Sequence, residues 1–214
     1  GIHSAPEDQL KIKPLPELCY QCHDNVQGDK TKNSFVHAPV TDVRSCANCH
    51  SPHASSEKKY LLSDHKTLCL SCHNKTIKVK DEKSIRNIKQ MLDNSKIIHG
   101  AIESGGCIIC HKPHAADNSK LLVNNFPEGN YAPAKPESFG ICFDCHDSDL
   151  LTVSATTTAT DFRNGDKNLH NLHIKGDKGR NCKVCHNIHG SVNEHLIEEI
   201  VPFGKWEMKM NYVV

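Results

Sequence analysis

Apolar residues along this 214-residue chain rarely repeat with the period of a helix or a strand. The best amphipathic stretch covers residues 81–93, where several apolar side chains share one helical face. These are Ile85, Ile88, Met91 and Leu92. A second short helix is predicted over residues 193–200, because Pro202 would end it. The pattern therefore predicts a mostly irregular fold with short α-helices and little β structure.

Polar segments separate the rest of the chain into short pieces. Residues 127–136 form a proline-rich loop, and the threonine-rich residues 152–160 predict a polar loop or an edge strand. No apolar run approaches the length of about 18 residues that indicates a membrane span. The start, GIHSAPEDQL, lacks the apolar core of a signal peptide, so we interpret it as the mature end left after removal of one.

The composition shows that the chain has a low fraction of hydrophobic residues. Hydrophobic residues make up 37% of the chain, and leaving out the 12 cysteines lowers this to about 31%. Aromatic residues contribute only 5%. The net charge of +1 argues against a nucleic-acid-binding protein, which normally has a clustered basic excess. Something other than side chains is expected to supply apolar bulk.

Every cysteine lies in a Cys-x-x-Cys-His motif, and none is left over. The motifs are Cys19-Cys22-His23, Cys46-Cys49-His50, Cys69-Cys72-His73, Cys107-Cys110-His111, Cys142-Cys145-His146 and Cys182-Cys185-His186. A shuffled chain of this composition would contain about 0.05 such motifs. Zinc ribbons pair Cys-x-x-Cys without needing the adjacent histidine, and thioredoxin-like motifs need a βαβ pattern that is absent here.

The motif spacing has a direct chemical meaning. Two thiols three positions apart can form thioethers to the two vinyl groups of one haem, and the next residue then places its imidazole under the iron. We therefore expect six covalently bound haem c groups, around which a single hexahaem domain covering residues 1–214 is organised. Such attachment takes place outside the cytoplasm, which predicts an extracellular, cell-surface or periplasmic protein.

The motifs fall into two alternating kinds, which reveals an internal repeat. The second, fourth and sixth motifs carry a histidine three residues after the motif histidine: His53, His114 and His189. The same motifs are preceded, eight or nine residues before the first cysteine, by His37, His99 and His173. The other motifs have neither flanking histidine. We divide the chain into units at about 19–73, 99–146 and 170–189, with an N-terminal arm 1–18 and a C-terminal tail 190–214.

In residues 37–73 and 99–146, this arrangement resembles the doubled-CxxCH family of multihaem cytochromes, with a truncated third unit at 173–189. The resemblance implies covalent haems, mostly with two histidine ligands, packed in a close chain that conducts electrons. Some members of that group are similar to subunits of extracellular cytochrome filaments. The resemblance does not identify an electron donor or acceptor for this chain.

Sixteen histidines provide more than enough axial ligands for six irons. Recurrence in register predicts that the distal ligands are His37, His53, His99, His114, His173 and His189. His170 competes with His173 for one of these roles, whereas His65 and His195 are expected at the surface or behind a ligand. Of the methionines Met91, Met208 and Met210, the first is expected to pack rather than bind iron.

The three-residue spacing also restricts which iron each flanking histidine can reach. Three residues span at most about 11 Å when extended, too little to pass around a porphyrin from one face to the other. His53 is therefore expected to bind a different haem from His50, and His114 and His189 likewise. Each His-x-x-His segment then links two neighbouring haems.

The sequence predicts an electron carrier rather than an enzyme, because irons with two imidazole ligands have no open position for a substrate. The rival reading is a multihaem reductase with one open haem, and a soluble periplasmic shuttle is the alternative carrier. Partners are expected to be other redox proteins or extracellular acceptors. The proline-containing arm with His3, and the tail with the single Trp206, favour a homo-oligomer or filament in which His3 or a flanking histidine binds a neighbour's haem. The lysine-rich stretches 75–83 and 205–209 are expected to be solvated faces.

Overall fold

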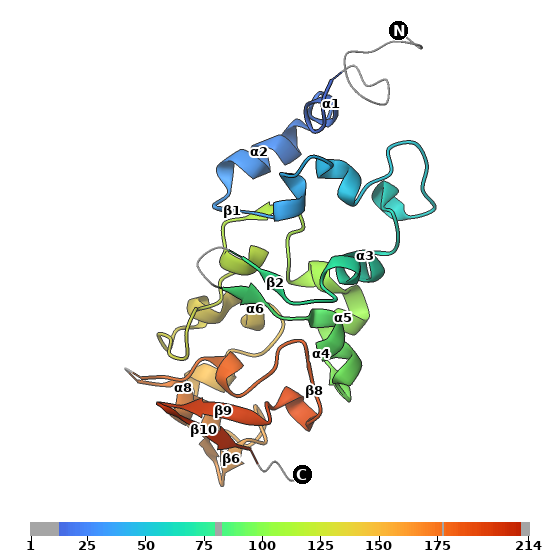
Figure 1. Ribbon diagram of the computed structural model, residues 1–214. Helices are drawn as coiled ribbons and strands as arrows, with labels where there is room; N and C mark the ends of the chain where they lie inside the picture. The colour runs from blue at the N-terminus through green and yellow to red at the C-terminus, as the bar shows by residue number, and fades with distance from the viewer. Residues whose placement is uncertain (1–12, 80–82, 177, 211–214) are drawn as a thin grey trace. The chain divides into compact units, whose positions relative to one another are not determined.

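The computed structural model describes residues 13–79, 83–176 and 178–210 (Figure 1). The chain divides into two compact units, each built from two chain segments. Unit 1 combines Gly1–Ser71 with Cys110–Val123, and unit 2 combines Cys72–Ile109 with Asn124–Val214. His3 and most of the predicted N-terminal arm lie outside the described residues.

Regular structure is short everywhere, which confirms the predicted fold class. The α-helices are α1 (Glu17–Tyr20), α2 (Asp24–Lys32), α3 (His65–Cys72), α4 (Ile88–Asn94), α5 (Gly100–Gly105), α6 (Gly140–Phe143), α7 (Asp149–Thr152) and α8 (Leu169–Ile174). Single 3-10 turns are η2 (Ala38–Val40), η3 (Ser45–Asn48), η4 (Lys58–Tyr60), η5 (Cys107–Ile109), η6 (Ser119–Leu121), η7 (Pro136–Phe139), η8 (Cys182–Val184) and η9 (Glu194–Leu196). None of the described helices has the length and apolar character that a membrane crossing requires.

Within the described residues, the strands form two-stranded antiparallel ladders. They are β1 (Phe35–Val36) with β5 (Ala115–Ala116), β2 (Ile77–Lys78) with β3 (Ser84–Ile85), β4 (Ile97–Ile98) with β8 (Gly190–Ser191), β6 (Arg163–Asn164) with β7 (Lys167–Asn168), and β9 (Ile200–Phe203) with β10 (Trp206–Lys209). Two ladders join equivalent places of successive repeats. The strand before His37 pairs with the strand after His114, and the strand before His99 pairs with the strand after His189.

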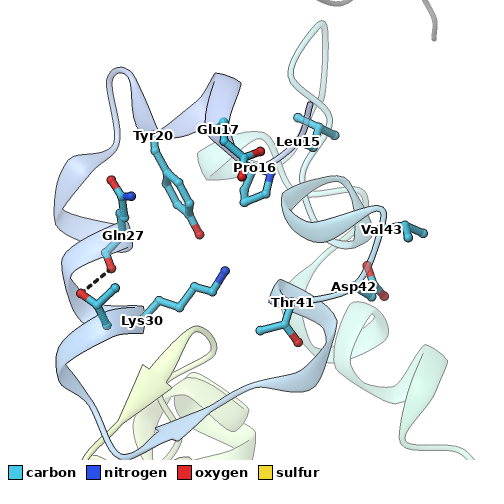
Figure 2. Close-up of a pocket in the computed structure, with 10 residues that line it drawn as sticks. Leu15, Pro16, Glu17, Tyr20, Gln27, Lys30, Thr41, Asp42 and Val43 are labelled. Carbon is cyan, nitrogen blue, oxygen red and sulfur yellow. Dashed lines mark hydrogen bonds between the residues drawn. The ribbon is translucent and has the colours of Figure 1, made fainter. Parts of the chain in front are cut away.

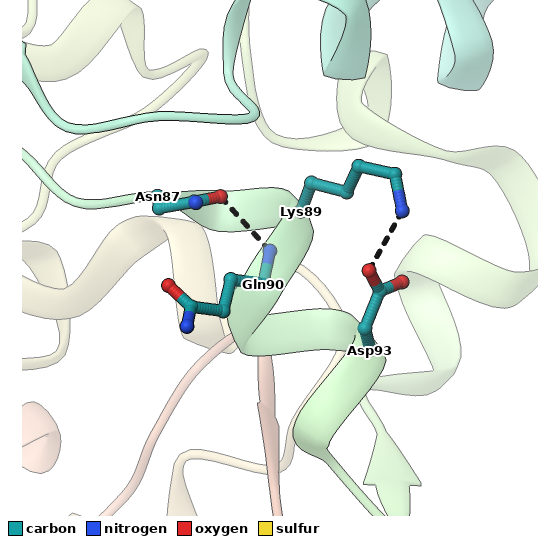
Figure 3. A network of polar contacts seen from close by, with 4 residues as sticks. All are labelled: Asn87, Lys89, Gln90 and Asp93. Atoms are coloured by element: carbon teal, nitrogen blue, oxygen red, sulfur yellow. Dashed lines mark hydrogen bonds and ion pairs between the residues drawn. The ribbon is translucent and has the colours of Figure 1, made fainter.

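The helix predicted over residues 81–93 forms only in its second half, as α4. Asn87 begins it, because its side-chain oxygen accepts a hydrogen bond from the Gln90 amide at 2.9 Å (Figure 3). Lys89 and Asp93, four residues apart, form an exposed ion pair at 2.7 Å (Figure 3). Leu92 is the buried residue of the helix, whereas Ile85 lies in β3.

The helix predicted over residues 193–200 is wrong. The chain makes one turn at η9, in which His195 and Leu196 have the left-handed φ angles 52° and 57°. It then runs as β9, which contains Pro202 and pairs with β10. Two consecutive left-handed residues cannot continue a right-handed helix, so the segment turns at η9 and enters a strand at Ile200.

Buried apolar residues are few in both units. In unit 1 they are Ala115, Ala116 and Leu122. Unit 2 has a cluster of Ala132, Phe139, Leu151 and Ile174. Phe126 and Phe143 meet Phe139 edge to face at 6.3 Å, and Cys142 and Cys182 pack against the same cluster. The core of unit 2 is therefore built directly beside two of the cysteine motifs.

The fully buried Asn168 connects two helices of unit 2. Its side-chain amide donates to the carbonyl oxygens of Asp149 and Val153 at 3.1 and 2.9 Å, at the two ends of α7. Its side-chain oxygen accepts from the Asn171 amide at 3.2 Å and so caps α8. The start of α8, which carries His170 and His173, is held by this one side chain.

Replacing Asn168 with Ala is expected to lower the free energy of unfolding by about 3 kcal/mol, because buried carbonyl oxygens lose their donor and α8 loses its cap. The matched variant Asn87→Ala removes only an exposed cap and is expected to cost about 1 kcal/mol. Denaturant unfolding followed by circular dichroism measures both. Equal losses would show that the buried contacts of Asn168 add nothing to its capping role.

Candidate functional site

The Cys-x-x-Cys-His motifs form tight local turns. In four of them the histidine amide donates to the carbonyl oxygen of the first cysteine four residues earlier, at 2.9–3.0 Å. These pairs are His23 with Cys19, His50 with Cys46, His146 with Cys142, and His186 with Cys182. One helical turn therefore brings both thiols and the imidazole of each motif toward the same side, as attachment of a single planar cofactor requires.

All twelve cysteines lie within the described residues, and none forms a disulfide. First cysteines of successive motifs contact one another: Cys19 with Cys46 in unit 1, and Cys142 with Cys182 in unit 2. Burial, together with the nearby Cys46, raises the pKa of the Cys19 thiol to about 11. The hydrogen bond to Cys182, followed by burial, raises the pKa of Cys142. The same hydrogen bond lowers the pKa of Cys182, and both thiol pairs are held in contact.

Motif histidines lie opposite histidines from outside the motifs. Their ring centroids are 6.2 Å apart for His50 and His114, 6.2 Å for His99 and His146, and 6.3 Å for His170 and His186. Each pair combines one motif histidine with one histidine elsewhere in the same unit. His114 faces His50, two motifs away, and not His111, its neighbour in sequence.

The separation fits an iron bound between two imidazoles. A metal–imidazole nitrogen bond is about 2 Å long, so an iron between two rings leaves their centroids about 6 Å apart. The residues present therefore fit haem c, with a motif histidine on one face and its partner ring on the other. Exposed apolar side chains inside a motif, such as Ile108 and Ile109, also fit a large apolar plate beside them.

Backbone carbonyl groups fix the tautomer of several of these imidazoles. Nδ1 of His50, His111 and His186 lies 2.8–2.9 Å from a carbonyl oxygen nine residues later in the chain. A carbonyl oxygen can only accept, so Nδ1 carries the proton and Nε2 keeps the lone pair that a metal binds. Nδ1 of His37 is held in the same way by the Pro113 carbonyl at 2.9 Å.

Burial favours the neutral imidazole, which is the form that binds iron. It lowers the pKa of His99, His114 and His186, and in each case a nearby histidine contributes. For His170, burial and the neighbouring His186 and His173 lower the pKa to about 4. Each ring pair therefore contains at least one imidazole that its surroundings favour in the neutral form.

At the sixth motif the structure places His170, and not His173, opposite the motif histidine. The His170 and His186 rings are nearly parallel, at 14°, and Thr160 and Phe162 contact the His170 ring. His173 lies one turn further along α8, is exposed, and donates from Nδ1 to the Leu169 carbonyl at 2.7 Å.

His173 differs from the flanking histidines of the other two copies in its position relative to the start of the nearest helix. His37 and His99 directly precede η2 and α5 in extended conformation, with ψ near 125°. His173 is instead inside α8, four residues after its first residue Leu169, whereas β7 ends directly before the helix. The third copy of the repeat therefore matches the others in spacing but not in local structure.

The remaining candidate ligands have less complete geometry. His37 lies near His111 in unit 1; burial lowers the pKa of His37, and the nearby His111 adds to this effect. Among the described residues, the exposed rings of His23 and His53 have no ring partner. His73 and His189 have buried Nδ1 atoms. His65 begins α3, and His3 lies outside the described residues.

A hollow in unit 1 borders the first motif (Figure 2). It lies between α1, α2 and the loop at Asp42, and Tyr20 from within the motif points into it (Figure 2). Lys30 reaches over the Tyr20 ring at 5.8 Å. Among the described residues, no cluster of three or more His, Cys, Asp or Glu side chains forms a site for a bare metal ion.

Comparison with known protein families matches residues 37–78 and 99–150 to the family described as "Doubled CXXCH motif". The chain therefore carries this doubled motif twice. It is a multihaem c-type cytochrome that binds haem c covalently and transfers electrons. No curated protein matches the chain. The matched segments contain the second to fifth motifs of the cytochrome, and the first and sixth motifs lie outside them.

Sequence reasoning missed the carbonyl groups that hold the motif histidines. They belong to Lys59, Lys120 and His195, each followed by Tyr or Leu and then Leu or Ile. This shared tripeptide, nine residues after the motif histidine, was the available signal. In the third copy the signal is weak, because the residue is His195 and the surrounding residues differ.

Proposed function

We propose that this cytochrome conducts electrons through six haems, most of them bound between two imidazoles. The observation that carries the proposal is the set of ring pairs at 6.2–6.3 Å, each joining a motif histidine to a histidine outside the motifs. Iron with two such ligands has no open position, which favours a carrier over a reductase. Two neutral imidazoles also stabilise ferric iron, so low potentials are expected.

The contacts between cysteines support close haem spacing. Each first cysteine forms one thioether of its haem, so contact between Cys19 and Cys46 brings the edges of the first two haems together. The contact between Cys142 and Cys182 does the same for the last two. Closely spaced haems allow rapid electron transfer from one to the next.

The proposal extends to assembly: the cytochrome acts outside the cytoplasm, as a subunit of an extracellular or surface conduit or filament. The hairpin of β9 and β10 supports this, since Trp206 is 76% exposed and Phe203 is 58% exposed. Arg180 holds the hairpin by contacting the rings of Phe203 and Tyr131, each at 5.3 Å. A soluble periplasmic shuttle is the alternative, and the assembly state separates the two.

The mature protein is expected to contain six haems per chain, all low-spin when oxidised. Each motif has both thiols and its histidine, and the chain has enough further histidines for every iron. A pyridine haemochrome assay and an oxidised visible spectrum measure the two properties. Five or fewer haems would contradict the count. Stoichiometric binding of carbon monoxide would favour a reductase with an open haem.

Two variants of one helix test the axial ligand at the sixth motif. His170→Ala is expected to convert about one sixth of the haem to a high-spin form, because the ring opposite His186 is lost. His173→Ala, one turn away on α8, is expected to leave the spectrum unchanged. Electron paramagnetic resonance of the oxidised protein measures the high-spin fraction. The reverse pattern would assign the ligand to His173.

The assembly proposal is tested at His3, which is separated from Cys19 by enough residues to span roughly 50 Å when extended. If His3 binds a haem of a neighbouring copy, His3→Ala is expected to shorten or abolish filaments and leave one haem high-spin. Electron microscopy and the same spectrum measure both effects. Intact filaments with only low-spin haem would exclude His3. A native protein that is monomeric would exclude assembly itself.

A further inference from the structure

A turn of unusual backbone conformation follows the second, fourth and sixth motifs at the same distance. Its two central residues both have left-handed φ angles between 52° and 59°. They are Lys59 and Tyr60, Lys120 and Leu121, and His195 and Leu196. The first residue of each pair supplies the carbonyl oxygen that accepts from Nδ1 of the motif histidine. We call this arrangement the histidine clip.

The clip is fastened to the motif by further hydrogen bonds. The amide after the motif histidine donates to the carbonyl of the second left-handed residue, at 2.7–2.8 Å in all three copies. The motif histidine also forms a β-bridge with the next residue, which is Leu61, Leu122 or Ile197. In each copy a serine or asparagine side chain donates to the carbonyl of that residue. The three copies differ in sequence and share this backbone.

Consecutive left-handed residues are costly for side chains with a Cβ atom, by about 1–2 kcal/mol each. A turn or a reversal of the chain could use glycine at both positions, because glycine adopts left-handed angles without this cost. In the first copy the side chains of Lys59 and Tyr60 are exposed. Their conformation is therefore maintained for the contacts of their backbone. The polar contact of this backbone with the predicted ligand His50 is the Lys59 carbonyl oxygen, which accepts from Nδ1.

We propose that the histidine clip is a positioning device that tunes the haem of its motif. A carbonyl that accepts from Nδ1 fixes the ring orientation and makes Nε2 a more basic ligand. A more basic ligand stabilises ferric iron and lowers the reduction potential. The clip residues act through the motif histidine, because their backbone carbonyl groups contact its Nδ1. The inference rests on the proposed function, because it requires iron bound to His50, His111 and His186.

The test uses the holoprotein with the double variant Lys59→Val/Tyr60→Val. Valine strongly disfavours left-handed φ angles, so the carbonyl is expected to leave His50. The control is Lys59→Gly/Tyr60→Gly, which removes the same exposed side chains but accepts the conformation. A spectroelectrochemical titration measures the haem potentials. Exchange of the His50 Nδ1 proton in nitrogen-15-labelled protein measures the hydrogen bond.

The valine variant is expected to shift one haem to a more positive potential and to speed exchange of the His50 proton. The glycine variant is expected to change neither. Faster exchange without a shift in potential would overturn the proposal, as would equal shifts in both variants or no change in either. If the valine variant does not mature, His195→Val and His195→Gly test the clip of the sixth motif. A parent protein without low-spin haem would refute the proposed function instead.

Discussion

A neutral imidazole can bind iron through Nε2 only while Nδ1 carries the ring proton. In this chain, backbone carbonyl groups fix that tautomer by accepting a hydrogen bond from Nδ1. Nδ1 of four candidate ligands, His37, His50, His111 and His186, faces a carbonyl oxygen at 2.8–2.9 Å. The small ladders and left-handed turns exist in a chain with very little buried apolar surface, where they contribute little packing energy. The left-handed turns place three of these carbonyl groups, and the ladder of β1 with β5 lies beside the fourth, that of Pro113.

The short elements therefore make sense as supports for histidines rather than as layers of a core. The ladders of β1 with β5 and β4 with β8 end at His37 and His99, whose amides donate to the carbonyls of His114 and His189. The cluster around Phe139 packs against Cys142 and Cys182. Several of the short elements thus occur where a ligand or a thiol must be held. A haem-bearing protein can fold in this way because the cofactor supplies apolar area that the sequence lacks.

The sequence predicts features that are determined by residue types, and it does not predict features that are determined by local backbone conformation. The cysteines, the motif histidines and the scarcity of regular structure follow from identity and composition. The start of α4 depended on the Asn87 cap, which the apolar pattern does not contain. The helix predicted over residues 193–200 failed because His195 and Leu196 are left-handed, and neither residue type signals that conformation. Spacing favoured His173, but the cap at Asn168 places α8 around both histidines and turns His170 toward His186.

The interlocked ladders also impose an order of events on biogenesis. Val36 pairs with Ala115 and Ile98 pairs with Gly190, so the ladders beside the second and fourth motifs close only after a segment about eighty or ninety residues later has been synthesised. Until then, the strand before each of these motifs lacks the strand that it pairs with. Contacts so distant in sequence form slowly, so the local structure around these two motifs is completed late in folding.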